Sequence, residues 1–563
     1  MNLPRSPFWP AHLPTHLTPP ATNLFYNAEV AATRYPDKPF IIFYDTAVTF
    51  AQFKHGAEHV AGFLQQRCGV KAGDRVLLYM QNSPQWMIAY YGILRANAVV
   101  VPVNPMNMTD ELRHYVEDSG SRTAFVAHDL YPRVAPLVGE ADGQLANVVV
   151  ATYSDYLKQP PDITLPDFMT ARCSVAGPGI TYWADALDAS LAPGPLTAGP
   201  DDLCVMPYTS GTTGKPKGCM HTHRNVMFTA IGGINWIGGT QDSVVLGVLP
   251  FFHVTGMQGG LNSPLYSGST VVVLPRWDRD AAARAIAYNR VTVWHSISTM
   301  IVDFLSNPKL HDYDLSSLRW MRGGGAAMPE AVAKKLKETF GLDYIEGYGL
   351  TETIATTHAN PPQRPKPQCL GIPVFDVDAR VVDPTTLELV PQGETGEIVV
   401  HGPQVMLGYW RNQDATREAF VEIDGKQFLR TGDLGRVDED GYFFMADRLK
   451  RMINASGYKV WPAEVEAMMY DHPAIQEVCV IGARDARRGE TVKAFVVPDP
   501  KQSGRVTPAD ILAWARERMA SYKAPRIVEF VASLPKSGSG KIMWRALQEQ
   551  EAAKAAASEE TEP

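Results

Sequence analysis

Short runs of apolar residues alternate with amphipathic stretches along most of the chain. The runs are rich in β-branched residues and comprise Arg75–Met80, Ala98–Val103, Arg122–Ala127, Asn147–Ala151, Leu203–Met206, Val244–Leu249 and Ser269–Leu274. Helical patterns lie between several of them, as at Asp278–Asn289 and Pro329–Phe340. In the second helical stretch Val332, Leu336 and Phe340 recur at a spacing of four residues. This alternation predicts an α/β fold with largely parallel sheets.

The pattern changes after Gln392. The segments GETGEIVVHGP and Gly441–Met445 predict strands joined by tight turns, as in a small β subdomain. A further unit begins near Asp447–Lys450, and its strand and helix patterns are Val478–Ile481, Lys493–Val497 and Pro508–Met519. We therefore predict an N-terminal domain over 1–449 and a small α+β C-terminal domain over 450–563.

Three further segments show no sustained pattern. Residues 152–200 are rich in Pro, Asp, Gly and Ala, and we expect a surface excursion there. The tail Glu549–Pro563 mixes Ala and Glu without a sustained apolar face, which indicates a frayed helix or a disordered end. The N-terminal MNLPRSPFWPAHLPTHLTPP lacks the apolar core of a secretory signal. No run along the chain reaches the ~18 apolar residues of a membrane span.

Composition narrows the classes of function. The 563 residues carry 52 Lys+Arg against 60 Asp+Glu, a net charge of −8, which argues against binding nucleic acid by bulk electrostatics. Hydrophobic residues make up 45% of the chain, which is enough for a full core and excludes global disorder. The six cysteines have no paired spacing. This argues against a disulfide framework or a structural zinc site and favours a cytoplasmic enzyme with reduced thiols.

The segment YTSGTTGKPKG, Tyr208–Gly218, predicts a phosphate-binding loop after a strand. It packs three glycines, four Ser/Thr hydroxyls and two lysines into eleven positions. Glycine lets the backbone approach a phosphate closely, exposed N–H groups form an anion-binding concavity, and lysines add positive charge. The loop is not of the Walker A type, because only two residues separate Gly211 from Gly214 and a proline follows Lys215.

Together with five later motifs, this loop resembles the signature of the adenylate-forming superfamily, which includes acyl-CoA synthetases, firefly-type luciferases and the adenylation domains of peptide synthetases. The later motifs are EGYGLTET at Glu346–Thr353, RTGD at Arg430–Asp433, DRLKRMI at Asp447–Ile453, SGYKVWPAEVE at Ser456–Glu466 and PKSGSGK at Pro535–Lys541. The resemblance covers roughly residues 25–546 and is strongest to fatty-acid–CoA ligases. It implies a large N-terminal domain of two α/β subdomains plus a β-barrel, followed by a small mobile C-terminal domain.

The resemblance implies an AMP-forming acid–thiol ligase with ATP, Mg²⁺ and CoA. A carboxylate attacks the α-phosphorus of Mg-ATP to give an acyl-adenylate and pyrophosphate, and the thiol of CoA then displaces AMP. A medium- to long-chain fatty acid is the expected substrate, and an aryl or branched carboxylate is the alternative. A noncatalytic acyl- or nucleotide-binding protein is a hypothesis of another class, and the joint presence of Lys541, Glu352 and Asp433 argues against it. The expected partners are the carboxylate and CoA, without nucleic acid, and a homodimer is left open.

The resemblance assigns nucleotide-binding roles to residues of the first domain. Those that would hold the β- and γ-phosphates are Thr209, Ser210, Gly211, Thr212, Thr213, Gly214 and Lys215. Tyr348 would stack on adenine, Thr351 would contact the α-phosphate, and Glu352 would hold Mg²⁺. The turn that would close over the adenine comprises Gly324, Gly325 and Ala326.

Further roles fall on residues near and beyond the predicted domain boundary. Asp433 would accept hydrogen bonds from both ribose hydroxyls, and Arg448 would contact ribose or phosphate. Lys450 is the expected hinge, and Gly457 would give the pantetheine arm access to the backbone. Lys541 would bridge the carboxylate and the α-phosphate, a role that suits a point cation on a flexible stem. The basic residues considered for the CoA phosphates are Arg484, Arg487, Arg488 and Lys493, with a solvated surface as the alternative.

The choice of acid depends on residues along the acyl channel, which His253 is expected to gate. The helical pattern Asn225–Gly239 is apolar and rich in glycine, as the wall of a long apolar channel would be. His295 and Ser298 depart from the G-V-P-T that the family often has before its pocket helix, so rules of acyl selectivity are not carried over. In a shorter pocket for an aryl or branched acid, Trp236 or His295 would form the cap.

Overall fold

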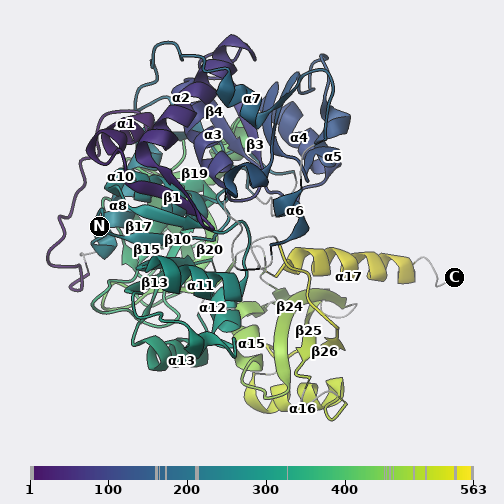
Figure 1. Cartoon of the computed structure of the whole chain (residues 1–563). Helices are drawn as coiled ribbons and strands as arrows, with labels where there is room; N and C mark the ends of the chain where they lie inside the picture. The colour runs from purple at the N-terminus through teal and green to yellow at the C-terminus, as the bar shows by residue number, and fades with distance from the viewer. Residues whose placement is uncertain are drawn as a thin grey trace. The chain divides into compact units, whose positions relative to one another are not determined.

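The computed structural model describes residues 6–158, 163, 165–171, 174–209, 215–325, 328–448, 451, 453–455, 458–460, 462–485, 489–500, 504–520, 522–537 and 542–559. The chain divides into two compact units (Figure 1). The first comprises Met1–Asp378 and Val400–Leu429, and the second comprises Ala379–Val399 and Arg430–Pro563.

A seven-stranded sheet belongs to the first unit. Its strands are β3 (Arg75–Tyr79), β4 (Val99–Pro102), β5 (Thr123–Ala127), β6 (Asn147–Ala151), β7 (Ile180–Tyr182), β8 (Leu203–Val205) and β9 (His221–Thr222). The order is β7-β6-β5-β3-β4-β8-β9, and every pair is parallel except β8–β9. The predicted strand runs are confirmed here. The expectation of a surface excursion over 152–200 is wrong at β7, because this strand pairs with the otherwise open edge of β6.

A nine-stranded sheet completes the two α/β layers of this unit. Its strands are β1 (Pro39–Phe43), β2 (Thr46–Thr49), β10 (Val244–Gly247), β11 (Thr270–Val273), β12 (Val293–Ser296), β13 (Trp320–Gly324), β14 (Tyr344–Leu350), β15 (Ala355–Ala359) and β16 (Ile372–Pro373). The order is β16-β15-β14-β13-β12-β10-β11-β1-β2. Neighbours from β14 to β1 are parallel, and β2, β15 and β16 are antiparallel at the edges. The α/β prediction is therefore confirmed.

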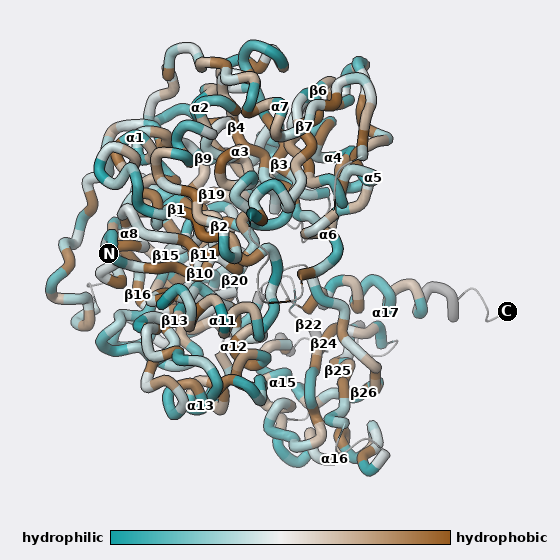
Figure 2. The backbone as a smooth tube through the Cα atoms, in the orientation of Figure 1, coloured by the Kyte–Doolittle hydropathy of each residue, from teal (hydrophilic) through white to brown (hydrophobic). Residues whose placement is uncertain are grey.

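Helices cover both sheets, whose inner strands are the most apolar part of the unit (Figure 2). The α-helices are α1 (Phe25–Arg34), α2 (Phe50–Gln66), α3 (Pro84–Arg95), α4 (Thr109–Ser119), α5 (Tyr131–Val134), α6 (Asp167–Thr170), α7 (Trp183–Asp188), α8 (His223–Ile237), α9 (Val254–Met257), α10 (Ser263–Ser267), α11 (Arg279–Asn289), α12 (Ser298–Leu305), α13 (Glu330–Phe340) and α14 (Gln413–Ala419). Shorter turns are η1 (Ala135–Leu137), η2 (Tyr153–Tyr156), η3 (Gln258–Asn262), η4 (Leu310–Asp312) and η5 (Thr351–Thr353). The turn η3 is a π-helix that joins α9 to α10, and such turns are frequent at functional sites.

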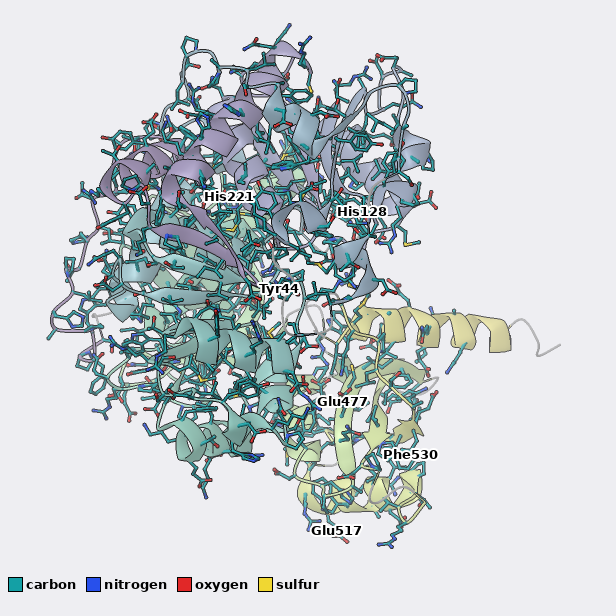
Figure 3. The ribbon with its side chains drawn as sticks, in the orientation of Figure 1. Tyr44, His128, His221, Glu477, Glu517 and Phe530 are labelled. Atoms are coloured by element: carbon teal, nitrogen blue, oxygen red, sulfur yellow. The ribbon has the colours of Figure 1, made fainter. Side chains whose placement is uncertain are left out.

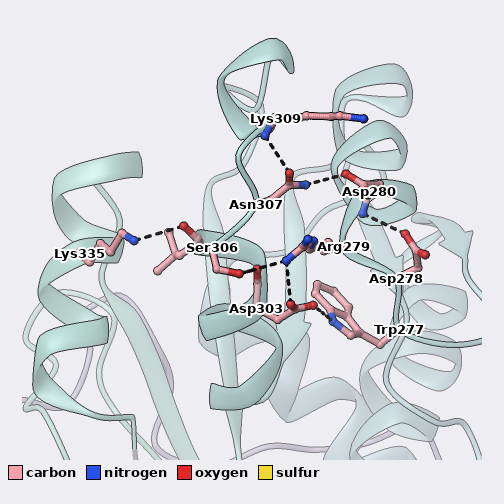
Figure 4. Close-up of polar contacts among 10 residues, drawn as sticks. Trp277, Asp278, Arg279, Asp280, Asp303, Ser306, Asn307, Lys309 and Lys335 are labelled. Carbon is pink, nitrogen blue, oxygen red and sulfur yellow. Dashed lines mark hydrogen bonds and ion pairs between the residues drawn. The ribbon is translucent and has the colours of Figure 1, made fainter. Parts of the chain in front are cut away.

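One face of the nine-stranded sheet is densely packed. Successive side chains of a strand point to opposite faces. On this face Trp294 of β12 stacks on Trp277 at 5.6 Å between ring centroids and meets Phe304 of α12 at 4.8 Å. Beside them the carboxylate of Asp303 accepts hydrogen bonds from Trp277 Nε1 at 2.8 Å and from Arg279 Nη1 at 3.3 Å (Figure 4). We call this side, which α11 and α12 cover, the packed face.

The second unit contains most of two five-stranded sheets. The strands of one are β17 (Asp378–Val382), β18 (Gly396–His401), β19 (Phe420–Ile423), β20 (Lys426–Val437) and β21 (Phe443–Arg448). Those of the other are β22 (Ile453–Ala455), β23 (Tyr458–Val460), β24 (Ile475–Asp485), β25 (Gly489–Pro498) and β26 (Ile527–Phe530). The helices are α15 (Pro462–Met469), α16 (Pro508–Arg518) and α17 (Trp544–Glu559). The order of the first sheet is β17-β18-β20-β19 with β21 on β20, so the expected barrel stays a prediction.

The C-terminal tail is helical through Glu559, and the end of the stretch, 560–563, lies outside the described residues. Leu547 of α17 is buried in a small cluster with Phe495 and Leu534. Gln548 Nε2 also donates to the carbonyl of Gly482 at 2.7 Å. The first turns of this helix are therefore anchored by packing that its Ala- and Glu-rich sequence does not reveal.

Candidate active site

The two ends of the predicted phosphate loop pair with each other. Tyr208 and Gly218 form an antiparallel bridge, and the N–H of Thr209 donates to the carbonyl of Lys217 at 2.9 Å. Lys215 is exposed beyond this stem. The rest of the expected phosphate cradle, Ser210, Gly211, Thr212, Thr213 and Gly214, lies outside the described residues. The stem therefore holds Thr209 and Lys215 at the two ends of the loop.

Helix α4 supports the stem from one side. Tyr208 Oη donates to Asp118 Oδ2 at 2.6 Å, and its ring lies 4.4 Å from that of Tyr115. His114 Nε2 donates to the carbonyl of Pro216 at 2.8 Å, since a carbonyl can only accept. Both strands of the stem are thus attached to one helix, which restrains the base of the loop.

A second support is the segment Met406–Trp410, which we call the clamp. Its backbone pairs with the strand that leaves the loop, through Trp410 N to Gly218 O at 2.8 Å and Met220 N to Gly408 O at 3.0 Å. On its other side Met406 N donates to the carbonyl of Glu352 at 2.8 Å. The clamp therefore brings the phosphate loop and the EGYGLTET motif together, although the three segments are far apart in the sequence.

The carboxylate of Glu352 is oriented by the clamp. Tyr409 Oη donates to Glu352 Oε1 at 2.8 Å. Burial and the neighbouring charge of Glu352 hold the pKa of Tyr409 above its usual range, so the phenol stays protonated and can donate. Within the described chain Glu352 Oε2 has no hydrogen-bond partner. Lys217 Nζ lies over the Tyr409 ring at 4.2 Å from its centroid. The carboxylate of Glu352 and the ammonium of Lys217, which belongs to the loop stem, thus contact the same Tyr409 side chain.

This donor set fits Mg²⁺ held jointly with a substrate. Magnesium is usually bound through one or two carboxylates together with substrate phosphates and water. In the described part of the chain no group of three or more His, Cys, Asp or Glu side chains is placed to hold a metal by itself. The second oxygen of Glu352 is the group available for such a cation.

Thr351 is positioned by the buried side chain of His221, which is labelled in Figure 3. His221 Nε2 donates to the carbonyl of Thr351 at 2.8 Å. Burial lowers the pKa of His221 to about 4, so the ring is neutral and its proton is on Nε2. The backbone then turns sharply, because Ile354 and Ala355 have φ values of 43° and 91°. Such left-handed backbone is costly for residues with a Cβ and is concentrated at functional sites.

The predicted adenine turn has a packing reason for its glycines. A Cβ at Gly324 would lie 2.1 Å from the carbonyl oxygen of Gly347 on the neighbouring strand β14. Gly325 has a φ of 91°, whereas Ala326 lies outside the described residues. Tyr348 is 8% exposed, and its ring lies 5.6 Å from that of His358. Close strand packing therefore explains Gly324 without a nucleotide, and stacking of Tyr348 on adenine stays a prediction.

His253 begins helix α9. It is the N-cap residue, and its Nδ1 accepts a hydrogen bond from the N–H of Thr255 at 3.3 Å. Thr255 itself lines an internal cavity. The expected gating residue is thus next to an internal space, and its role stays a prediction.

That cavity lies between the nine-stranded sheet and helix α8 with the α9–η3–α10 segment, on the face opposite the packed face. It leaves about 40 Å³ in which the centre of a water molecule fits. Val293 and His295 of β12 and Arg322 of β13 line it from the sheet, and Ile237 lines it from α8. A smaller cavity adjoins it and shares Arg322. We call this side of the sheet the cavity face.

The two residues expected to cap a short pocket line different cavities. His295 lines the larger one, and Trp236 lines the smaller one. Trp9, from the proline-rich N-terminal segment, meets Trp236 at 5.2 Å and Phe375 at 5.3 Å between ring centroids. The N-terminal segment therefore backs the wall of the smaller cavity, a role that its sequence did not indicate.

In the second unit, Asp433 and Arg448 are cross-strand neighbours on β20 and β21. Asp433 is fully buried, and its N–H donates to Thr431 Oγ1 at 3.1 Å. The turn before it is held by Glu397, which is 1% exposed and accepts from Arg430 Nη2 at 2.6 Å. The structure thus places the two expected ribose residues side by side along the backbone.

Several predicted residues cannot be placed. Lys450, Gly457 and Lys541 lie outside the described residues, as do Arg487 and Arg488 among the candidates for the CoA phosphates. The suggestion that Lys493 meets those phosphates is wrong, because its ammonium is 2.8 Å from Glu529 and 2.6 Å from Glu551 and is buried between them. Its charge is therefore already neutralised within the unit.

The sequence matches two family models. The AMP-binding enzyme model matches residues 28–410, and the AMP-binding enzyme C-terminal domain model matches residues 464–541. The chain belongs to the AMP-binding enzyme family. The recognition from ordered motifs is thereby confirmed. The interval 411–463 between the two matches contains the domain boundary expected at residue 450, which stays a prediction.

Full-length relatives of this AMP-binding enzyme act on several acids. It is 36% identical over 552 residues to a long-chain-fatty-acid–CoA ligase of Bacillus subtilis (strain 168), covering 96% of this chain and 97% of the relative. It is 35% identical over 502 residues to a feruloyl-CoA synthase of Amycolatopsis sp, covering 88% and 93%. The structure of the anthranilate CoA ligase AuaEII in complex with anthranoyl-AMP matches with a TM-score of 0.82 and 28% identity, covering 97% and 99%.

Sequence reasoning missed several residues of this AMP-binding enzyme's site. They are Asp118, His221 and Tyr409. Tyr409 lies in the triplet Gly-Tyr-Trp at 408–410, and nothing in the sequence pairs it with Glu352. Among the helices that the structure describes, none is long and apolar enough to cross a membrane.

Proposed function

We propose that this protein is an ATP-dependent acyl-CoA synthetase that activates a medium- to long-chain fatty acid and transfers the acyl group to CoA. The observation that carries the proposal is the clamp, which joins the phosphate-loop stem to Glu352 through backbone and side-chain hydrogen bonds. A loop for phosphates beside an oriented carboxylate suits phosphoryl chemistry, where positioning and charge neutralisation supply most of the catalysis. The similarity to full-length acid–CoA ligases supports the same assignment.

The reaction has two balanced steps. A carboxylate oxygen of the acid attacks the α-phosphorus of ATP, and the bond from that phosphorus to the bridging oxygen breaks to release pyrophosphate. The sulfur of CoA then attacks the acyl carbon, its proton leaves, and AMP departs as the phosphate oxygen takes the electron pair. The mixed anhydride makes the second step feasible, because AMP is a far better leaving group than hydroxide.

The residues of the first unit supply binding and orientation. Thr209 and Lys215 would contact the β- and γ-phosphates, Thr351 the α-phosphate, and Glu352 Oε2 would hold Mg²⁺. The cation would neutralise phosphate charge. Tyr409 keeps the carboxylate of Glu352 turned toward this region by donating to Oε1. His221 plays the same orienting part for the Thr351 backbone.

The residues of the later motifs complete the proposal. Asp433 and Arg448 would bind the ribose, and Lys541 would neutralise the reacting carboxylate and α-phosphate in the first step. Lys450 would be the hinge, and the Gly457 segment would admit pantetheine in the second step. The described cysteines have free thiols, which supports a cytoplasmic location, and a homodimer stays an open prediction.

An aryl or branched carboxylate is the second candidate substrate. The small volume of the cavity and the position of His295 in its wall favour a compact acid. Relatives named feruloyl-CoA synthase and anthranilate CoA ligase support the same chemistry. Both candidates share the two steps above and differ only in the acid.

The test is acid-dependent pyrophosphate release by the full chain, with and without CoA, over C4 to C18 fatty acids, benzoates and cinnamates. Thioesters are identified by mass spectrometry. Lys541→Ala should lose adenylation by several orders of magnitude and still convert supplied acyl-adenylate and CoA to thioester. Lys536→Ala is the matched control, because that exposed lysine pairs with Glu477 at 2.6 Å. Absence of acid-dependent pyrophosphate release in the wild type would refute the proposed function.

A further inference from the structure

The cavity face holds two polar side chains that the adenylation chemistry does not use. Arg322 of β13 and His295 of β12 are direct neighbours in the parallel register, and both line the larger cavity. Arg322 also lines the smaller cavity. A cation and an imidazole therefore face the same internal space.

Arg322 is a cation without a carboxylate partner. Its hydrogen bond within the described chain is from Nη1 to the carbonyl of Gly233 at 3.2 Å, and no described acid lies within ion-pair distance of it. Burial lowers the pKa of Arg322 to about 10, so the guanidinium remains charged at neutral pH. A guanidinium has five N–H donors, and the side chain of Arg322 is only half-buried, so its unpaired donors remain accessible from the cavity. Most of its donor capacity is thus available to a molecule in the cavity.

His295 adds a neutral polar group beside it. Burial, with the charge of Arg322, lowers the pKa of His295 to about 3, so its ring carries one donor and one acceptor nitrogen. Neither ring nitrogen has a hydrogen-bond partner among the described residues. A Cβ at position 259 would lie 2.8 Å from His295 Nδ1, so Gly259 leaves the space that this ring occupies.

Several other polar side chains of the wall are already satisfied. The hydroxyls of Thr229, Ser263 and Ser269 donate to backbone carbonyls at 3.2, 3.0 and 2.9 Å. Gln258 Nε2 donates to the carbonyl of Val226 at 3.2 Å. Arg322 and His295 therefore differ from these neighbours, because their polar atoms remain to be paired.

The cavity extends past these two residues along the sheet. At one end it reaches Ala355, in the strained turn that follows Glu352. At the other it reaches Ser243, before the first residue of β10. Because Val245 pairs with Val293, Ser243 lies about four residues, roughly 13 Å, from the level of His295. By register, Arg322 lies between these two ends of the cavity lining.

We propose that Arg322 binds an oxygen function on the acyl chain, so that the preferred substrate is an oxygenated or dicarboxylic acid rather than a plain saturated one. This rests on the proposed function and names the acid that it uses. A carboxylate, oxo or hydroxyl oxygen accepts hydrogen bonds from the guanidinium, and His295 donates to the same oxygen or accepts from a hydroxyl. A wall that binds only a hydrocarbon chain would gain nothing from a cation.

The test compares acids of one length in the full-length enzyme: decanoate, 3- and 10-hydroxydecanoate and decanedioate, with cinnamate and 4-hydroxycinnamate as the aryl pair. The wild type should prefer at least one oxygenated member of a set over its unsubstituted parent. Arg322→Leu should lower kcat/KM for that acid by roughly 10- to 100-fold, mainly through KM, and leave the unsubstituted acid unchanged or improved. The diacid and hydroxy acids distinguish an anionic from a neutral oxygen.

Two further variants separate binding from folding. Arg322→Lys keeps the charge and should retain part of the preference, even if Arg322→Leu folds poorly. Arg319→Leu removes an exposed arginine of the preceding segment and should leave the preference intact. Equal loss with every acid would overturn the proposal, because Arg322 would then serve the reacting carboxylate or the fold.

The outcome is distinguishable from failure of the proposed function. Activity on plain acids with no oxygen preference would refute the Arg322 assignment and leave the ligase intact. No activity on any acid would refute the ligase itself. Binding of decanedioate without ATP, followed by thermal shift, supplies an independent reading: the wild type should be stabilised and Arg322→Leu should not.

Discussion

The two faces of the nine-stranded sheet carry alternate residues of the same strands. They differ in the ionisable side chains that they contain and in how the charge of these side chains is accommodated. On the packed face, Trp294 lies among aromatic rings. Glu346 of β14 shares that face by register, and burial raises its pKa to about 7. A carboxyl group can thus become neutral by keeping its proton.

On the cavity face, Arg322 cannot become neutral in this way, because its pKa stays far above neutrality. The two faces therefore differ in whether they accommodate an acid or an arginine. An acid whose pKa is raised can keep its proton up to about neutral pH and is tolerated on a closed face. A permanent cation belongs on a face with a space for the partner that the protein lacks.

The largest expected effect is on the packed face. Trp294→Ala should destabilise the first unit by about 3–5 kcal/mol, because a fully buried ring leaves a cavity. Trp294→Phe, which keeps an aromatic ring, is the control and should cost much less. The melting temperature measures both. A change in the relative kcat/KM of different acids would contradict the separation of the two faces.

The stability of the protein should depend on pH because of Glu346. Glu346 has its pKa raised from 4.5 to about 7, so its contribution to stability is present below 4.5 and is lost as the pH rises through about 7. Glu346→Gln keeps an oxygen to accept from Met328 N and Gln368 N and cannot ionise. The variant should therefore gain stability relative to wild type by roughly 1–3 kcal/mol between pH 5 and pH 8. If the difference in stability between the variant and the wild type were the same at pH 5 and at pH 8, this expectation would be wrong.

On the cavity face, Gly259→Ala should disturb binding more than folding. The new methyl group would lie 2.8 Å from His295 Nδ1, so the ring must move into the cavity. We expect KM for the preferred acid to rise about tenfold, which corresponds to about 1.4 kcal/mol. Gly199→Ala is the control, since its Cβ would meet nothing closer than 3.8 Å. An unchanged KM would show that acids do not reach this part of the cavity.

The smallest effect is expected for the polar contacts at the rim of the packed face. Arg279 and Asp303 are 39% and 43% exposed, so Arg279→Met should cost under about 1 kcal/mol and leave acid preference unchanged. Salt should screen what contribution there is. Melting temperatures of variant and wild type at low and high salt measure this. A larger loss would mean that the packed face depends on its ion pairs as well as its aromatic rings.

Much of the fold was predictable from apolar runs, because buried parallel strands are almost uniformly apolar and short. The runs near Arg75, Asn147 and Val244 became strands with nearly the predicted bounds. The strand β7 was missed, since its ITY triplet is too short to stand out from a polar segment. Helix α17 was left ambiguous, because its anchor is one leucine against another element.

The residues of the candidate site also fall into those that the sequence predicted and those that only the structure revealed. Glu352 and Thr351 were found from one octapeptide, since their neighbours in the sequence carry the signal. The partners that orient them, Tyr409 and His221, come from segments far along the chain, and only strand pairing and the clamp bring them within hydrogen-bond distance.

The sequence by itself determined the family, the α/β class and the order of the chemical motifs, because each is written in contiguous residues. Only the tertiary structure decided which face of a strand each residue occupies. Arg322 stands between a methionine and a glycine, and nothing local distinguishes it from a surface cation. The register of β12 against β13 turns it toward His295 and the cavity. The partly buried guanidinium, which no acid of the described chain pairs with, is then left facing that space.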